Sequence, residues 1–589
     1  MRNARQPDQA LRLLATVIAA LAPVLGLVGW TIDIGPELRH VPEIFVRAMR
    51  LYIPSPDIIA DETKNPILRT AASFGALSGA AGGFAIWMAS ANQKLAHLVT
   101  RYIRRGHTVV IGGTRLASHL AHALSLQGAV PVHVSETPPP NPKLPPDDRR
   151  IVMEPTPQML ARHAGLLRAG QVAIDSGSDA ETLLIAKQLL AYLDGNGAGS
   201  IAHVAVRVAD PVLADLFFEF ARRTGLGQSV KVSAFDENTV AARRTLSVDP
   251  LFCRAAARGH KRVHALIVGF GDLGEKLFDQ VMLTSVAGDL ASPRITVVDR
   301  DAEALKRAFS ARRPAVCDTL PVSFISLDVG ADPLEGDGTA AGMRAVAAAE
   351  KEDPFTAIYL ALPQAADNIR AALLLHRHQE RTGELAAPIF YRSRGDGDGE
   401  LLATPAPAPD ADDGFIALPI PYAQVARTVL GDTSTETLAR RLHESYLAGA
   451  GASAAAAKPW EDLPETLRRS NMRAADHLKA KLWTLGFKLC SDGGVPSLEA
   501  AERERLKRLV GAPHDDPLVD KLARIEHERW SIDRKLDGWV YGPERDDRRR
   551  IHPKLVPFDD LTMTREDIDK DVSQILAAIG YMLDAEDGA

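Results

Sequence analysis

The sequence has few cysteines, few aromatic residues and no large excess of one charge, and these shortages exclude several classes of protein. Its three cysteines, Cys253, Cys317 and Cys490, are too few and too far apart for a disulfide framework or a cysteine-rich zinc site. The 69 basic and 75 acidic residues leave a net charge of −6, which argues against a nucleic-acid binder that relies on positive charge. With 46% hydrophobic residues, the 589-residue chain can form several folded domains in a reducing compartment.

Recognisable catalytic motifs are also missing. We find no nucleophile elbow, no phosphate-binding P-loop and no Cys/His spacing that suits a metal ion. The pair His527-Glu528 begins like a zinc-protease motif, but Ser531 stands where the second histidine is required. We therefore predict that the chain is not an enzyme and holds no metal.

Long uncharged stretches are confined to the first hundred residues. Leu13–Ile32 has 20 residues without a charge and Thr70–Ala91 has 22. At about 1.5 Å per residue, a helix of either length can cross a hydrocarbon layer of about 30 Å. We predict a membrane domain over residues 1–106 with two transmembrane helices in the lipid bilayer. A secretory signal is the alternative for the first stretch, but no small-residue cleavage site follows Trp30.

The charges beside the two stretches predict their orientation. The flanking basic residues are Arg2, Arg5, Arg12, Lys94, Arg101, Arg104 and Arg105. Because basic flanks stay on the inner side, we expect both termini to face the cytoplasm from the cell (inner) membrane. Gly75, Gly79 and Gly83 recur every fourth residue, which favours close packing against another helix. No TVGYG-like run follows, so the filter of potassium-selective channels is missing.

From His107 onward, short β-branched runs alternate with helical stretches, as is typical of a parallel sheet covered by helices. The pattern occurs twice, so we predict an α/β protein with Rossmann-like domains over residues 107–250 and 262–445. The expected strands are Thr108–Ile111, Val130–Val134, Val172–Ile174, Ile201–Arg207 and Val230–Ala234, then Val263–Val268, Ile295–Val298, Val322–Ser326, Ala357–Ala361, Pro388–Tyr391 and Phe415–Leu418.

The second repeat carries a dinucleotide-binding motif after its first strand. The motif consists of Gly269, Phe270, Gly271, Asp272, Leu273 and Gly274. Its glycines permit a tight turn, close approach of a pyrophosphate and close helix packing, and the helix N-terminus supplies N–H donors. Asp299 would accept a ribose hydroxyl, and Arg300 and Asp328 complete the predicted site. The expected cofactor is NAD(H) or another adenine nucleotide; the alternative is that the glycines only shape the turn.

The corresponding turn of the first repeat departs from this motif. Thr114 stands at the second glycine position and Ala117 at the third, so a side chain occupies the place where phosphate would approach. Glu136 ends the next strand, but Pro138 to Pro140 follow it and prevent a normal helix start. We expect this copy to be structural or to bind a different ligand.

Several short sequence motifs in the two repeats suggest a protein family. They are Val172-Ala173-Ile174-Asp175, Asp179-Ala180-Glu181, Val204-Ala205-Val206-Arg207 with Asp210-Pro211, and Ile358-Tyr359-Leu360-Ala361 with Asp367-Asn368. Together with two membrane helices, this arrangement resembles channel subunits with RCK domains, the regulators of potassium conductance. The resemblance covers residues 108–430 and implies ligand-sensing domains that dimerise or form rings.

After a Gly/Ala/Ser-rich linker at residues 449–458, a separate domain of mainly helical character is expected over residues 458–589. Its distinctive phrases are Leu522 to Trp530, Gly538-Trp539-Val540-Tyr541-Gly542, Asp546-Asp547 and His552-Pro553-Lys554-Leu555-Val556-Pro557-Phe558. In this order they resemble the RyR repeat of ryanodine receptors, which also occurs as a bacterial module.

The C-terminal domain contains aromatic and basic residues that suit a ligand site. Helical spacing places Glu526 near Arg529 and His527 near Trp530. Three aromatic residues could stack a base while two arginines pair with phosphates. The predicted site residues are His527, Arg529, Trp530, Trp539, Tyr541 and Arg545. The competing interpretation is that the tryptophans belong to the core and His527 is structural.

The features combine into three functional hypotheses. The first is a membrane-embedded homo-oligomer, a tetramer or another ring, whose cytoplasmic domains bind nucleotides and gate the membrane helices as a ligand-gated channel or ion-transport regulator. The second keeps the sensors but makes the helices an anchor, with a separate protein as partner. The third, a membrane-tethered NAD-dependent oxidoreductase, depends on the Rossmann glycines alone, and this fold binds nucleotides without transforming them equally well.

Overall fold

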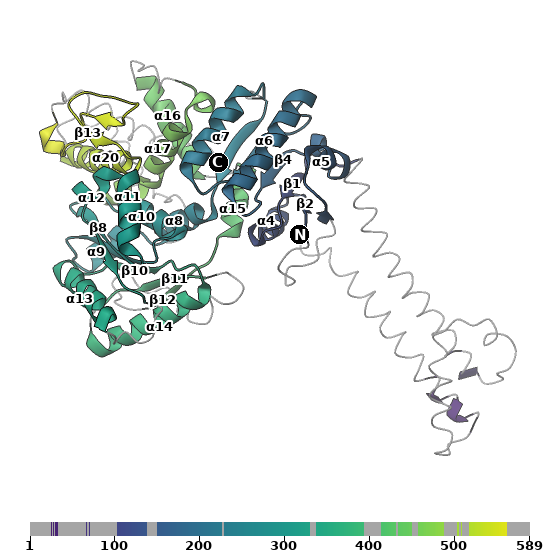
Figure 1. Cartoon of the computed structure of the whole chain (residues 1–589), viewed down its shortest axis with the longest axis horizontal. Helices are drawn as coiled ribbons and strands as arrows, with labels where there is room; N and C mark the ends of the chain where they lie inside the picture. Colours follow the sequence, from purple (N-terminus) through teal and green to yellow (C-terminus); the bar gives the residue numbers. More distant parts are fainter. Residues whose placement is uncertain are drawn as a thin grey trace. The chain divides into compact units, whose positions relative to one another are not determined.

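The computed structural model of the chain describes residues 103–137, 150–226, 229–329, 337–383, 385–393, 414–431, 434–449, 458–487 and 517–561, with isolated positions elsewhere (Figure 1). Both predicted transmembrane stretches lie outside these residues, apart from a few single positions. Among the residues that are described, no helix is both long enough and apolar enough to cross a membrane.

The first Rossmann-like unit contains a six-stranded sheet with the order β3-β2-β1-β4-β5-β6. The paired strands run parallel, and central runs such as Thr108-Val109-Val110-Ile111 are buried on both faces. The strands are β1 (Thr108–Ile111), β2 (Pro131–Ser135), β3 (Arg150–Val152), β4 (Gln171–Ile174), β5 (His203–Arg207) and β6 (Lys231–Phe235).

The second unit repeats this topology with the order β12-β11-β10-β7-β8-β9. Strand order therefore reverses between β7 and β10, the first and fourth strands of the unit, and a crevice at their carboxyl ends is the usual ligand site of such sheets. The strands, again parallel, are β7 (Arg262–Val268), β8 (Ala291–Asp299), β9 (Val322–Ser326), β10 (Ala357–Leu360), β11 (Ile389–Arg392) and β12 (Phe415–Leu418).

All eleven predicted strands are present in the structure, with ends displaced by a few residues. The internal repeat and the α/β class are confirmed. The edge strand β3 was not predicted. It has only three residues, which are partly exposed, and the proline-rich segment before it carries no strand pattern.

Helices cover the two sheets, and their starts are encoded locally. Asp210 caps α7 and is followed by Pro211, while Ser178 caps α6 and Asp236 caps α8. The helices of the first unit are α4 (Arg115–Leu126), α5 (Pro157–His163), α6 (Asp179–Asn196), α7 (Pro211–Arg223) and α8 (Glu237–Val248). Those of the second are α9 (Leu251–Ala257), α10 (Asp272–Thr284), α11 (Ala302–Arg312), α12 (Pro314–Thr319), α13 (Asp337–Glu352) and α14 (Ala365–Thr382).

Helix α15 (Tyr422–Leu430) follows the second sheet but packs against the first unit. Its Val425, Ala426 and Val429 are fully buried in the core that α4 forms with the first sheet. The ring of Tyr422 stacks on that of His119 of α4, with centroids 4.3 Å apart. A helix that follows the second sheet in sequence therefore completes the core of the first Rossmann-like unit.

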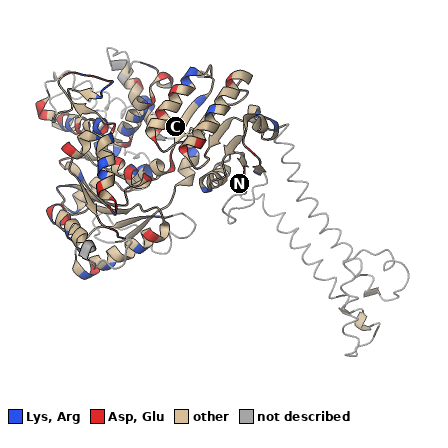
Figure 2. Ribbon diagram, viewed as in Figure 1, with Lys and Arg blue, Asp and Glu red and all other residues tan. Residues whose placement is uncertain are grey.

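The described part of the C-terminal domain is mainly helical, and the buried hydrophobic residues of its helices belong to the same cluster as buried residues of the second unit. Its elements are η5 (Trp460–Asp462), α17 (Glu465–Asp476), α18 (Leu478–Thr484), α20 (Pro517–Leu536), β13 (Val540–Tyr541), β14 (Ile551–His552) and η6 (Phe558–Asp560), preceded by α16 (Ser434–Gly449). Basic and acidic residues are interspersed over the described helices (Figure 2).

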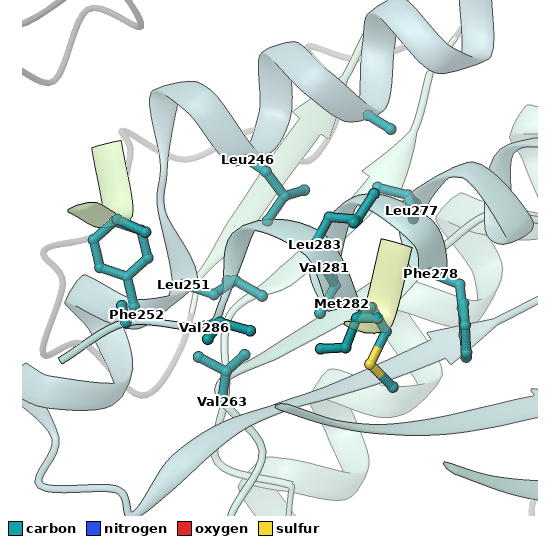
Figure 3. Close-up of a cluster of buried hydrophobic side chains, with 14 of the residues drawn as sticks. Leu246, Leu251, Phe252, Val263, Leu277, Phe278, Val281, Met282, Leu283 and Val286 are labelled. Carbon is teal, nitrogen blue, oxygen red and sulfur yellow. The ribbon is translucent and has the colours of Figure 1, made fainter. Parts of the chain in front are cut away.

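One hydrophobic cluster extends from the second sheet into this domain. Figure 3 shows part of it, in which α10 contributes Leu277, Phe278 and Val281, together with Leu246 of α8 and Leu251 of α9. The same cluster includes Leu522 and Ile525 of α20, which packs directly against α10 and α12. Because the core is shared, α10 is held between the second sheet and the C-terminal domain.

Candidate functional site

The glycine turn after β7 has the backbone geometry that the motif predicts. Gly269 has φ = +89°, a region that favours glycine, and its amide donates to the carbonyl of Val298 at 2.8 Å. A Cβ on Gly274 would lie 2.1 Å from the carbonyl oxygen of Gly269, so only glycine lets α10 pack this closely on the turn. The predicted roles of the first and third glycines agree with this geometry.

Gly271 faces open space at the start of α10. It is the N-cap residue, with no side chain to cap the helix, and a Cβ built on it would meet no atom within 4 Å. A helix N-terminus without a side-chain cap offers backbone N–H donors and partial positive charge to an anion. The turn therefore leaves room for a phosphate at the place where the motif predicts one.

Asp299 braces this turn. One carboxylate oxygen accepts the amide of Phe270 at 2.9 Å, and the other accepts the amide of Asp301 at 3.0 Å. Each carboxylate oxygen has further acceptor capacity, so the same group can still receive a ribose hydroxyl. The phenyl ring of Phe270 is buried against Phe278, Phe309 and Phe324, and it therefore anchors the turn in the core.

The remaining predicted residues of this site lie around the turn. Asp272 is exposed in the first turn of α10, Leu273 is buried beneath it, and Asp328 is exposed after β9. The side chain of Arg300 is 74% exposed and lies 3.3 Å from Asp301. Acidic groups outnumber basic ones here, so the helix N-terminus is the main attraction for a phosphate.

The first unit fills the equivalent position with its own side chain. Thr114 is the N-cap of α4, and its hydroxyl accepts the amide of Ala117 at 2.9 Å and donates to the carboxylate of Asp175. Burial raises the pKa of Asp175 above its usual value, although the bond from Thr114 opposes this change. The Thr114 side chain therefore occupies the place that Gly271 leaves open, in the copy that the sequence predicts to be structural or to bind a different ligand.

A second candidate site lies where the C-terminal domain meets both Rossmann-like units. A cavity of about 1440 Å³ is bounded by α7, α8, α10, α17, α20 and the segment 534–561. Of α10, it is lined by Glu275, Lys276 and Asp279 among others, whereas the glycine turn does not line it. The cavity and the turn are therefore two separate places that share one helix.

Aromatic and basic side chains meet at the α20 end of this cavity. Trp530 and Trp539 are half-buried, and their ring centroids lie 4.9 and 6.0 Å from that of His552. The guanidinium of Arg534 lies 5.9 Å from the ring of Trp530 and 5.7 Å from that of Trp539. Burial and the nearby cations Arg545, Arg534 and Lys554 lower the pKa of His552 to about 4, so its imidazole is neutral at pH 7.

The predicted residues of this domain differ in their surroundings. His527 lies 5.8 Å from the ring of Trp530, and its Nε2 lies 2.8 Å from the carbonyl of Val556, so it positions the segment after β14. Tyr541 is 60% exposed. Arg545 lines the cavity and pairs with Asp547 at 2.7 Å. Sequence reasoning omitted Arg534, His552 and Lys554, although Arg534 lies one helical turn after Trp530.

Arg529 lies in a buried ion-pair network beneath these rings. It is 2% exposed, and it donates to both oxygens of Glu526 at 3.0 and 2.7 Å. Glu526 also pairs with the buried Lys481 at 2.9 Å. Burial would raise the pKa of Glu526, but Arg529 and Lys481 lower it below its usual value. The helical pairing of Glu526 with Arg529 is as predicted, and Arg529 supports the site from below.

Comparisons with known proteins agree with part of this description. Residues 510–585 match the RyR domain family, so the predicted RyR domain at the C-terminus is confirmed. This match lies within the predicted domain of residues 458–589.

Several solved structures show a distant likeness to the chain. The crystal structure of GsuK bound to ADP is 15% identical, with 73% of this chain and 98% of that chain covered and a TM-score of 0.34. The GsuK channel bound to NAD is 13% identical, with 75% and 86% covered and a TM-score of 0.32. A dipicolinate synthase from Bacillus halodurans is 10% identical, with 56% and 96% covered and a TM-score of 0.19.

Proposed function

We propose that the chain is a nucleotide-sensing regulatory protein whose second Rossmann-like unit binds an adenine nucleotide. The observation that carries this proposal is the open space at Gly271, over a helix start without a side-chain cap, at the point where the strand order reverses. The first unit supports it by contrast, because Thr114 closes the same position there.

The ligand of the glycine turn is NAD(H) or a related nucleotide such as ADP, with an unmodified ribose. Asp299 is positioned to accept a ribose hydroxyl, and a 2′-phosphate would be repelled by this carboxylate. The pyrophosphate would lie on the amides at the start of α10. The glycine motif accounts for binding, and this fold binds nucleotides without transforming them, so the proposal is confined to binding.

The C-terminal cavity would hold a second nucleotide-type ligand. The indoles of Trp530 and Trp539 offer stacking surfaces, and Arg534, Arg545 and Lys554 offer positive charge for phosphates. Part of each ring is exposed, so both indoles are accessible to a ligand in the cavity.

The output of sensing would be a change in the membrane helices predicted at Leu13–Ile32 and Thr70–Ala91. In the first form of the proposal, a homo-oligomeric ring gates an ion pathway; in the alternative, the helices anchor the sensors beside a partner protein. Mass measurement of the purified chain in detergent separates them. A ring of several copies supports the channel, because two helices cannot enclose a pore, whereas monomers or dimers support the anchor.

Calorimetric titration of the full-length chain with NAD⁺ and with ADP tests the nucleotide site. Gly271→Val should abolish binding at the turn and leave the fold intact, because the new side chain enters open space where phosphate must approach. Gly195→Val is the matched control, since Gly195 of α6 also faces open space and lies far from the turn in sequence.

The comparison of the two variants decides the proposal. Loss of binding in Gly271→Val, with normal binding in Gly195→Val and equal thermal stability of both, supports it. Binding of either nucleotide with unchanged affinity to Gly271→Val places the site elsewhere. If the unmodified chain binds neither NAD⁺ nor ADP, the proposal is rejected.

A further inference from the structure

The two candidate sites are connected by a short turn after α20. Trp539 lines the cavity, and the residue before it, Gly538, has φ = +81°. A Cβ on Gly538 would lie 2.9 Å from the carbonyl oxygen of Arg312, at the end of α11. The backbone of the turn therefore lies directly against the second Rossmann-like unit.

Arg312 continues this connection to α10. Its two terminal nitrogens donate to the two carboxylate oxygens of Glu275, each at 3.0 Å, which fixes the relative orientation of both groups. Arg313 pairs with the same carboxylate at 3.0 Å and also with Asp279, one turn further along α10. Glu275 is thus held by two arginines from the segment that contacts Gly538.

Glu275 in turn belongs to the first turn of the helix that begins at the glycine motif. Its amide donates to the carbonyl of Gly271 at 2.9 Å, the first hydrogen bond of α10. The order of contacts is therefore Trp539, Gly538, Arg312, Glu275 and Gly271. It leads from a ring of the cavity to the residue that faces the predicted phosphate.

The turn itself is fixed at its other end by the C-terminal domain. The carbonyl of Asp537 accepts a hydrogen bond from Arg550 at 2.6 Å, and its carboxylate pairs with Arg473 at 2.9 Å. Arg473 also pairs with Asp533 of α20 at 2.6 Å. A turn held on both sides transmits a displacement instead of absorbing it.

We propose that this series of contacts couples the cavity lined by Trp539 to the glycine turn, so that a displacement at Gly538 changes the stability of the first turn of α10. A ligand in the cavity that displaces Trp539 would then change the affinity of the turn for its nucleotide. The ligands are those of the proposed function, but the coupling itself is a property of the unliganded chain.

Amide hydrogen exchange of the full-length chain, without any ligand, tests the coupling. Gly538→Ala should push the turn against Arg312 and accelerate exchange of residues 269–275 at least about five-fold, the lower end of ordinary coupling between sites. Gly383→Ala is the matched control, because Gly383 also has a positive φ of +69° but a Cβ there would meet nothing within 4 Å.

A second pair of variants addresses the middle of the connection. Arg312→Gln removes the pairing with Glu275 from a side chain that is 57% exposed, so the fold should persist. Arg307→Gln is its control on the same helix, where Arg307 bonds only the carbonyl of Glu303 among its described contacts. The double variant Gly538→Ala/Arg312→Gln should show less than the product of the two single effects, because both act on one connection.

The measured exchange decides between two results. Acceleration of residues 269–275 by five-fold or more in Gly538→Ala over Gly383→Ala, or in Arg312→Gln over Arg307→Gln if Gly538→Ala folds poorly, supports the coupling. Exchange below that limit in both overturns it. Because no nucleotide is added, this outcome is independent of the titration that tests the nucleotide site.

Discussion

The buried histidine His477, at the junction of α17 and α18, makes stability depend on pH. Its side chain is 0% exposed, and its Nε2 lies 2.7 Å from the carbonyl of Val286, to which it donates. Burial and the nearby cations Lys481 and Arg529, opposed by Glu526, lower the pKa of His477 to about 3. The native imidazole therefore stays neutral in a range where the unfolded chain takes up a proton.

The magnitude follows from linkage. The pKa of His477 is about 3 in the native state, against an ordinary value of 6.5 for a solvated histidine. Because the native pKa is the lower one, the contribution of His477 to the free energy of unfolding is complete above the unfolded pKa of 6.5. It is lost progressively as the pH falls from there through the native pKa of about 3. Between pH 7.5 and 5.5, one such group removes about 1.4 kcal/mol from the free energy of unfolding. For a domain of moderate size this corresponds to a fall of about 3–5 °C in Tm.

The assay is thermal unfolding of the full-length chain at pH 7.5 and 5.5, followed by tryptophan fluorescence, with His477→Gln as the test variant. Glutamine can still donate to Val286 but does not titrate, so the fall in stability on acidification should be smaller in this variant by about 1.4 kcal/mol. His203 and His264, whose pKa values burial lowers to about 4, titrate equally in both proteins. An equal fall in both would refute the account of His477.

Other positions give further expectations. Asp272→Asn removes a negative charge beside the predicted phosphate and should tighten ADP binding about two- to five-fold in calorimetry; weaker binding would show that the carboxylate helps to hold the ligand. Thr114→Ala removes the cap of α4 and leaves buried Asp175 without its hydroxyl donor, so urea unfolding should show a loss of about 1–3 kcal/mol. Thr114→Ser should restore most of that loss, and an unaltered midpoint in Thr114→Ala would contradict the capping role.

The strands of both sheets could be predicted because each is a short run rich in β-branched or other apolar residues between turn residues. Val322–Ser326 and Phe415–Leu418 were predicted to the residue, and the duplicated order gave the fold class. The packing of α15 onto the first unit could not be predicted, because its amphipathic pattern specifies only that one face is buried. Tertiary packing alone decides which surface covers the apolar face of α15.

The site was predictable to a similar degree. The glycine motif encodes its own backbone geometry, so the roles of Gly269 and Gly274 followed from residue type and spacing. Arg529 shows the limit of sequence patterns, since its spacing from Glu526 was apparent but the burial of its side chain was not. The contact of Gly538 with Arg312 joins segments more than two hundred residues apart, and nothing in either local sequence indicates it.

The return of α15 to the first unit has a consequence for biosynthesis. Residues 422–430 emerge from the ribosome only after the entire second sheet has been made, so the nascent first unit must wait with an uncovered apolar groove. At roughly 5–20 residues per second, that interval is on the order of ten seconds or more. A fragment ending near residue 250 would keep the groove permanently open, and we expect it to aggregate or to recruit chaperones.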